Sequence, residues 1–384
     1  MANPRLCDKK RVLVEEGLWA GKSARVIARE AKVSVGTVHN VREKQLAADL
    51  SAHRNQIRAI VAGKKYKDSI KDIDRLNKEL DRFKVASSWT KHYKPYQITR
   101  PNGKKGEAVA MLSVTDWHYE EEVLPASVNG LNEYNLEIAH DRCLRLWNSA
   151  VNIVEMCRTK SKIETMVVML LGDFINGWIH EEYLVTNLLT PPESFMRVFD
   201  ELVNGLTFLL KETKVKKIIV PCAIGNHGRI TKRKYVSKSA ATNWDYLLYH
   251  MLAKWFKAQG ETRIRFILPE GDETYIEVWG KPIRISHGDN ISYQGGVGGV
   301  HIPLRKAIDA WNKGIRAKFN YFGHWHQDLT GPDYRIGSSL IGWNPFCIRI
   351  KAQYNPPSQA FELQHPKYGS TGRFPLILDE DRSR

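Results

Sequence analysis

The chain is 384 residues long, with a formal net charge of +16 at pH 7 and a hydrophobic content of 42%. That length allows more than one folding unit, and that apolar fraction is typical of a soluble globular protein. No run of about 18 apolar residues occurs, so we expect no membrane span, and residues 1–10 lack the apolar core of a secretory signal. The five cysteines form no CxxC pair, which favours a reducing, cytoplasmic compartment over a disulfide scaffold.

The positive charge is concentrated near the N-terminus. Residues 1–108 hold 25 Lys and Arg against 12 Asp and Glu, whereas the remainder holds 33 against 30. Charge by itself favours a solvated surface. A polyanionic partner becomes the better interpretation only if the same region also has the pattern of a nucleic-acid-binding fold.

Three short helices are predicted at the start of this basic region. The first covers residues 8–19, and the second begins after Ser23, a suitable N-cap residue. A break at residues 32–34 precedes a third helix over residues 35–44. The apolar side chains expected to pack between the helices are Val12, Leu13, Leu18, Trp19, Val26, Ile27, Ala31, Val38 and Val41.

Residues 23–42, with the sequence SARVIAREAKVSVGTVHNVR, resemble the helix-turn-helix of transposases, resolvases and phage regulators. In that motif the last helix enters the major groove of DNA. The resemblance implies a small all-α DNA-binding domain over residues 1–48. The implied DNA contacts are Thr37, His39, Asn40, Arg42 and Lys44. A three-helix protein-interaction module is the alternative interpretation.

Residues 49–107 are predicted to form a charged helical segment followed by a linker. Apolar residues repeat there at spacings of 3, 4 and 3, at Ile73, Leu76, Leu80 and Phe83. Such spacing suits a short amphipathic helix or coiled coil, which makes this segment a candidate homodimer contact. Prolines and glycines between residues 93 and 107 indicate the linker.

From residue 108 onward, strands alternate with helices. The predicted strands are residues 109–115, 165–171, 217–224, 263–268, 274–279, 282–287, 318–323 and 335–342, and the predicted helices are residues 138–157 and 193–212. The pattern indicates an α/β fold in which two sheets pack face to face as a sandwich flanked by helices. We expect one such domain over residues 108–384.

Five short motifs, each after a predicted strand, carry metal-ligand residue types. They are Asp116-Trp117-His118, Gly172-Asp173, Gly225-Asn226-His227, Ser286-His287-Gly288-Asp289 and Gly323-His324-Trp325-His326. Ligands of α/β folds lie beyond the carboxyl ends of the strands, so these motifs are expected to converge. The set contains enough carboxylate, amide and imidazole groups for two adjacent divalent cations.

The order of the motifs resembles the DxH, GD, GNH, H and GHxH pattern of the calcineurin-like metallophosphoesterases, over about residues 109–345. The style is nearest to that of the double-strand-break repair exonucleases. The implied metal ligands are Asp116, His118 and His326 for the first ion, Asn226, His287 and His324 for the second, and Asp173 as the bridge. The resemblance also implies that His227 is the general acid, a role suited to an imidazole that titrates near neutrality.

Two metal ions answer the chemical difficulty of cutting a phosphodiester, which is anionic and resists attack by water. Cations about 3.5–4 Å apart can generate a hydroxide and clamp the phosphate oxygens. Mixed imidazole and carboxylate ligands suit manganese, iron or zinc better than calcium, and we favour manganese.

The sequence departs from the family pattern directly after His227. Many relatives have an acidic residue there, whereas this chain has Gly228-Arg229. Arg229 is a candidate substrate contact because a guanidinium can pair with two phosphate oxygens. Asn176 and His180, which follow the Asp173 motif, are the other candidate substrate contacts.

These features favour a two-metal DNA nuclease targeted by its helix-turn-helix, in a pairing typical of phage or mobile-element proteins acting in a bacterial cytoplasm. A tethered DNA-binding domain would raise the concentration of DNA at the catalytic site. A phosphodiesterase of cyclic nucleotides or nucleotides is one alternative, and a non-catalytic DNA-binding regulator is another. A protein phosphatase ranks last, because the GDxxDRG motif is replaced by Gly172-Asp-Phe-Ile-Asn-Gly-Trp178.

Overall fold

A computed structural model describes residues 8–61, 77, 106–235, 239–293 and 298–379. The chain divides into two compact units, Met1–Pro101 and Asn102–Arg384. None of the described helices is both long enough and apolar enough to cross a lipid bilayer.

The first unit contains three helices: α1 (Asp8–Trp19), α2 (Ala24–Glu30) and α3 (Val35–Val61). Ser34 caps α3, since its Oγ accepts a hydrogen bond of 3.1 Å from the backbone N–H of Thr37. The third helix continues well beyond the predicted end at residue 44, because residues 45–61 include neither glycine nor proline. The predicted apolar repeat of residues 73–83 lies outside the described residues, apart from Asn77.

A small apolar core holds the three helices together. Its buried members are Val14, Ile27, Ala28, Ala31 and Val38, with Leu18, Ala24, Val33 and Val41 partly buried around them. The predicted contacts of Val12, Leu13, Val26 and Trp19 are wrong, because all four side chains are exposed, Trp19 by 81%. The core face of α1 is set by Val14 and Leu18, one turn apart, and this turns the neighbouring residues outward.

The second unit contains two β-sheets. The six-stranded sheet has the order β11-β10-β1-β2-β3-β4, and the five-stranded sheet has the order β5-β6-β7-β9-β8. The strands of the first are β1 (Gly106–Val114), β2 (Ser161–Leu170), β3 (Lys217–Pro221), β4 (Ile264–Ile267), β10 (Ser358–His365) and β11 (Gly369–Ile377). Those of the second are β5 (Glu273–Val278), β6 (Lys281–Ser286), β7 (Phe319–Phe322), β8 (Leu329–Thr330) and β9 (Tyr334–Ile336). Strands β1 to β4 are parallel, as are β6, β7 and β9.

Alternation along the central strands places the two sheets face to face. On β2, Met166, Val168 and Leu170 join the core on the helix side. Val167 and Met169 point the opposite way and pack with residues of the second sheet, including Ile285. Both faces of this strand are therefore buried, as expected for a parallel strand between two layers.

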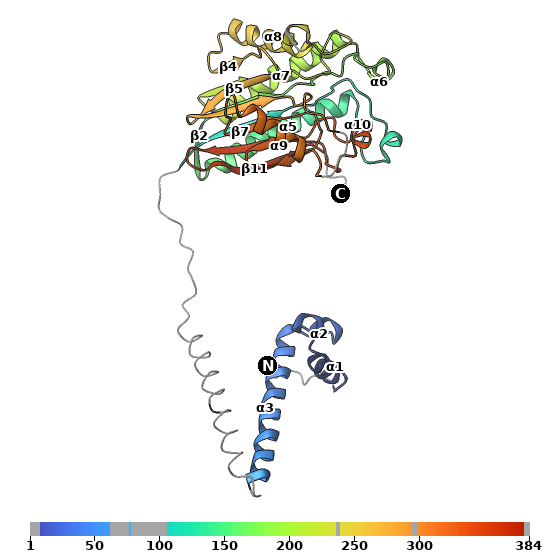
Figure 1. Ribbon diagram of the computed structural model, residues 1–384, viewed down its shortest axis with the longest axis vertical. Coiled ribbons are helices and arrows are strands. Elements are labelled where there is room, and N and C mark those ends of the chain that lie inside the picture. Colours follow the sequence, from blue (N-terminus) through green and yellow to red (C-terminus); the bar gives the residue numbers. More distant parts are fainter. Residues whose placement is uncertain (1–7, 62–76, 78–105, 236–238, 294–297, 380–384) are drawn as a thin grey trace. The chain divides into compact units, whose positions relative to one another are not determined.

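Helices cover the outer faces of the sandwich (Figure 1). The six-stranded sheet packs against α5 (Leu136–Arg158), α7 (Pro191–Thr213) and α8 (Trp244–Ala258), and the five-stranded sheet packs against α9 (His301–Trp311). The remaining helical turns are η1 (Pro125–Val128), α6 (Tyr183–Thr186), η2 (Ala240–Thr242) and α10 (Pro345–Arg349). The predicted α/β two-sheet sandwich flanked by helices is confirmed.

One predicted strand is too long. Residues 335–342 were expected to be extended throughout, but β9 ends at Ile336. The following residues form a loop in which Gly342 has a φ of 77°, a conformation that favours glycine. Leu340 and Ile341 are buried in the helix-side core, which explains why apolar residues occur here without a strand.

Candidate metal centre

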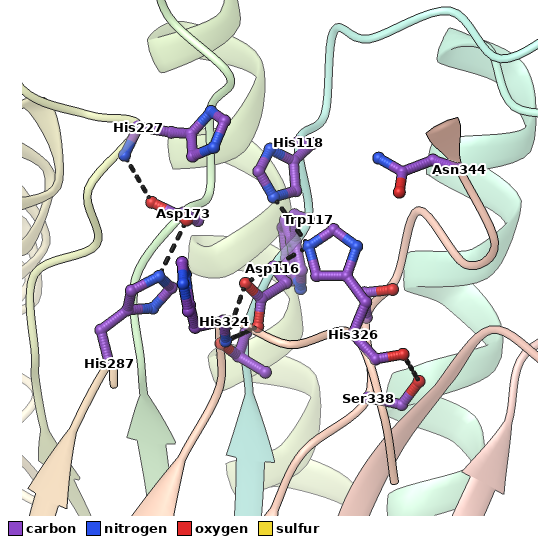
Figure 2. A network of polar contacts seen from close by, with 12 residues as sticks. Asp116, Trp117, His118, Asp173, His227, His287, His324, His326, Ser338 and Asn344 are labelled. Carbon is purple, nitrogen blue, oxygen red and sulfur yellow. Dashed lines mark hydrogen bonds and ion pairs between the residues drawn. The ribbon is translucent and has the colours of Figure 1, made fainter. Parts of the chain in front are cut away.

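The five motifs meet at one edge of the sandwich, beyond the carboxyl ends of parallel strands. Asp116 follows β1, Asp173 follows β2, and the loop of Asn226 follows β3 in the first sheet. His287 follows β6 and His324 follows β7 in the second sheet. Figure 2 shows the side chains of both sheets pointing into the same space.

The backbone at this edge is held in an uncommon conformation. Five non-glycine residues of the motifs have left-handed φ angles: Asp116 (51°), His118 (42°), Asp173 (55°), His324 (73°) and His326 (52°). Each such residue costs about 1–3 kcal/mol and persists only where its surroundings fix it. Clustering of this strain at the convergence of the motifs indicates a functional site.

Glycines allow the motif loops to approach one another closely. A Cβ on Gly225 would lie 2.0 Å from Asp173 Oδ1, and a Cβ on Gly323 would lie 2.6 Å from Asp116 Oδ2. Any other residue at these positions would collide with a carboxylate of the site. The glycines of the GNH and GHxH motifs therefore serve close packing.

The first group of candidate ligands consists of Asp116, His118 and His326. Asn176 Oδ1 lies 3.0 Å from His118 Nδ1, and because this amide oxygen accepts, the ring nitrogen donates. The free His118 Nε2 then faces His326 Nε2 at 3.2 Å. Asp116 Oδ1 lies 3.6 Å from the same His326 nitrogen. Two ring nitrogens and a carboxylate thus face a common point, as a metal ion requires.

The second group consists of Asp173, His287 and His324. His287 Nδ1 donates to the carbonyl oxygen of Leu171 at 2.7 Å, which directs Nε2 toward the site. That nitrogen lies 2.8 Å from Asp173 Oδ2 and 3.2 Å from the side-chain oxygen of Asn226. With the ring neutral, three acceptors face one another, an arrangement that a metal cation would satisfy.

Asp173 lies between the two groups. Its carboxylate also belongs to a third cluster, with His118 and His227, so it reaches the ligands of both candidate ions. Asp173 Oδ1 accepts a hydrogen bond of 2.7 Å from the backbone N–H of His227. This position suits a carboxylate that bridges two cations.

The electrostatics of the buried site also call for positive charge. Burial raises the pKa of Asp116 to about 7, although the charge on His287 opposes the shift. Burial opposes protonation of His287, but the carboxylates of Asp173, Asp116 and Asp289 together outweigh it and raise the His287 pKa to about 10. A proton on His287 therefore occupies the place that a divalent ion would take, and the donor set fits two such ions.

His227 lines a small cavity together with candidate ligands of both groups. Its Nδ1 is 3.3 Å from the carbonyl oxygen of Asn176, and its ring meets that of His118 edge-on at 4.6 Å. Burial lowers the pKa of His227 to about 3, although Asp173 opposes the shift. The ring is thus neutral before any substrate arrives.

The three predicted substrate contacts occupy different environments. Asn176 is fully buried and forms hydrogen bonds with His118 and Asn187. It therefore orients the candidate metal ligand His118 and does not face the cavity. Arg229 Nη1 donates to the carbonyl oxygen of Asn226 at 2.7 Å, which supports the metal-ligand loop. His180 is exposed, with its ring 6.4 Å from that of His227.

Several supporting residues were missed by the sequence reasoning. Asp245 Oδ2 accepts from the backbone N–H groups of Asp173 (3.1 Å) and Gly225 (2.9 Å), so it joins the loops after β2 and β3. Asn243, the N-cap of α8, donates to the carbonyl oxygen of Gly225 at 2.7 Å. The Asn243-Trp-Asp245 sequence before an apolar helix is the local signal for such a cap.

Glu121 and Cys347 were also missed. Glu121 is buried, lines the cavity with Asn344, and has its pKa raised to about 8 by burial. Cys347 Sγ lies 3.9 Å from His326 Nδ1, at the rear of that ligand. Neither residue belongs to a motif: Glu121 stands three residues after His118, and Cys347 lies in α10, which reaches the site only through tertiary packing.

No protein-family model matches the sequence, and no curated protein matches it. Some solved structures are similar at low identity. A conserved uncharacterized protein of Streptococcus pneumoniae TIGR4, a predicted phosphoesterase, is 10% identical with a TM-score of 0.26, over 69% of this chain and 97% of that chain. Wild-type Vps29 of Entamoeba histolytica complexed with zinc is 15% identical with a TM-score of 0.25, over 55% and 98%. The hypothetical protein PH1004 of Pyrococcus horikoshii OT3 is 14% identical with a TM-score of 0.33, over 71% and 89%.

Proposed function

We propose that the second unit is a two-metal phosphodiesterase of the calcineurin-like kind. The observation that carries the proposal is the convergence of Asp and His side chains into clusters that share Asp173, with the side-chain oxygen of Asn226 3.2 Å from His287 Nε2. Such paired sites suit phosphate esters because cations neutralise the phosphate and clamp both reacting oxygens. The mixed nitrogen and oxygen donors favour manganese, with iron and zinc as the other candidates.

The residues of the chain would divide the remaining tasks. Bound cations would supply a hydroxide at neutral pH and neutralise the phosphate. Asn176 and the carbonyl of Leu171 hold the rings of His118 and His287 in their ligating orientation. His227, whose Nδ1 faces a carbonyl oxygen, turns its other ring nitrogen away from that partner. An anionic phosphate beside this ring would raise its pKa, so His227 would take up a proton with the substrate and donate it to the leaving oxygen.

The proposed substrate is DNA, which makes the protein a nuclease. The support comes from the first unit, whose α3 exposes His39, Asn40, Arg42 and Lys44. Thr37, the remaining predicted DNA contact, is half-buried. Its Oγ1 forms a hydrogen bond of 2.8 Å with Ser34 Oγ, so this side chain takes part in the cap of α3. The surplus of basic residues over residues 1–108 favours a polyanion.

The test begins with metal content and turnover of the full chain. We expect two manganese ions per chain, and hydrolysis of methyl p-nitrophenyl phosphate and of labelled DNA that chelation abolishes and manganese restores. Hydrolysis of cyclic nucleotides without DNA cleavage would favour a small-molecule phosphodiesterase. Absence of metal binding and of turnover would instead leave a DNA-binding regulator.

A second test concerns targeting by α3. Replacing Asn40, Arg42 and Lys44 with alanine should weaken duplex DNA binding and lower its salt dependence by roughly one unit for each lost phosphate contact. The matched control is Lys9→Ala, an exposed residue of α1. Unchanged DNA affinity and salt dependence would favour the protein-interaction alternative for this unit. Dimer formation through residues 73–83 stays a prediction that light scattering can examine.

A further inference from the structure

A loop beside the metal centre has an anchored base. Glu120 Oε1 accepts from the backbone N–H groups of both Asn176 and Gly177, each at 3.0 Å. Asn187, at the other end of the loop, donates to the carbonyl oxygen of Gly177 at 2.8 Å and accepts from Asn176 at 2.9 Å. Residues 176–188 are therefore fixed at both ends by hydrogen bonds, which are buried at Glu120 and part-buried at Asn187.

The tip of this loop carries large apolar side chains that the protein leaves in solvent. Trp178 is 55% exposed, Leu184 65% and Val185 86%. The tip includes α6, which lies at the periphery of the second unit (Figure 1). Exposed apolar groups grouped beside a cleft, on a loop with a fixed base, are typical of a surface that contacts a ligand.

Aromatic rings connect the loop with the metal centre. The ring centroids of His180 and Tyr183 are 5.4 Å apart, and those of Tyr183 and His227 are also 5.4 Å apart. Tyr183 and His227 line the same small cavity as the candidate ligands. A flat ligand group that stacks on the outer rings would thus lie next to the phosphate undergoing attack.

A basic segment follows His227 in the sequence. Residues 229–235 follow the GNH motif, and this segment exposes Lys232 and Arg233. Neither side chain forms an ion pair within the described part of the chain. The base of the loop packs on the residue that stands two positions before the basic segment, since a Cβ on Gly177 would lie 2.7 Å from the His227 carbonyl oxygen.

We infer that the loop tip and the basic segment form a track for single-stranded nucleic acid, an inference that rests on the phosphodiesterase function proposed above. Bases stack on Trp178 and His180, while Lys232 and Arg233 contact the flanking phosphates. Glu181 and Glu182 also lie on the loop, which favours passage of the phosphates along the basic segment. Rings that alternate with cations are the means by which proteins bind single strands without reading their sequence.

The arrangement selects a single strand over a duplex. The candidate ligands Asp116, His118 and Asp173 are at most 2% exposed, so a phosphate must enter a narrow cavity to reach them. Bases of a duplex are stacked on one another and are not available to Trp178. A single strand can turn one base onto the loop while its phosphate enters the cavity.

The test compares two oligonucleotides of equal length, a single strand of thymidylates and an abasic strand that keeps only the phosphates. Trp178→Ala in the full chain should lower kcat/KM on the thymidylate strand by about tenfold, the effect of one lost stacking contact. The loss on the abasic strand should be less than a third of that. Trp279→Ala is the matched control, because Trp279 lies with Glu107 and Lys162 at the opposite ends of β1 and β2.

The basic segment is tested with the same strands. Lys232→Ala combined with Arg233→Ala should weaken binding of both strands and reduce its salt dependence, since both strands carry phosphates. Lys254→Ala combined with Lys257→Ala, exposed on α8, is the control and should leave both values unchanged. An equal loss in the two double variants would overturn the assignment of the phosphates to residues 229–235.

The outcomes separate this inference from the proposed function. Equal losses of Trp178→Ala on the thymidylate and abasic strands, or no loss, would sink the base-stacking track while leaving phosphodiester hydrolysis intact. If the wild-type chain cleaves no diester, the proposed function fails. Strand affinity, measured by fluorescence anisotropy, then decides whether Trp178 still selects for bases. Cleavage of a duplex faster than of either single strand would also contradict the inference.

Discussion

Replacing Gly225 with alanine should disable the metal centre through one methyl group. The added Cβ would lie 2.0 Å from Asp173 Oδ1 and 2.3 Å from the Asp173 backbone nitrogen, although ordinary contact begins only at 3.4 Å. The carboxylate oxygen must therefore retreat by about 1.4 Å, or the loop after β3 must move by a similar distance. A misplacement of about 1 Å can lower a rate by about 100-fold.

The same clash should lower stability, because overpacking of a tight interior costs about 1–3 kcal/mol. We expect Gly225→Ala to lose at least 100-fold in hydrolysis of methyl p-nitrophenyl phosphate and to bind manganese more weakly by calorimetry. Gly271→Ala is the control, since a Cβ at Gly271 meets nothing within 4 Å and its φ is not left-handed. A Gly225→Ala variant with two tightly bound ions and activity within threefold of wild type would refute this account of the glycine.

Two further predictions concern buried titratable groups. His227→Ala should slow hydrolysis of an alkyl ester by about 100-fold or more but affect a p-nitrophenyl ester far less, because a good leaving group needs no proton; equal losses on both esters would contradict the general-acid role. Burial raises the pKa of Asp245 to about 6 from 3.8, so the folded metal-free protein holds this proton more tightly than the unfolded chain. Its stability should then fall by roughly 3 kcal/mol through this group as the pH rises from about 4 to 6, and Asp245→Asn should remove that part of the fall in urea unfolding. An unchanged pH dependence in the variant would show that Asp245 is not the group responsible.

The sequence predicted most of the central elements of the second unit, because their signals are local. Continuous apolar runs such as residues 165–171 indicate strands buried on both faces, and β2 covers residues 161–170. The capping box of Thr190 and Glu193 explains why α7 begins slightly before the predicted helix, at Pro191. Strands β10 and β11 were not predicted, because β10 joins the sheet by pairing with β1, more than 240 positions away, as in Val109 with Gln364, and β11 pairs, among the described strands, only with β10.

The sequence itself thus determined the chemistry of the candidate metal centre and its approximate position in the fold. Residue types that bind metals follow strands in a fixed order, and parallel strands end at a common edge, so convergence could be predicted without coordinates. What only the tertiary structure decided was the role of the residues around them. Asn176, predicted as a substrate contact, lies behind His118 and forms a hydrogen bond with its ring. Asp245 and Cys347 contact the site from segments that carry no motif. The physical reason is that orientation, burial and hydrogen-bond partners arise from packing between distant segments, which no local pattern of residues records.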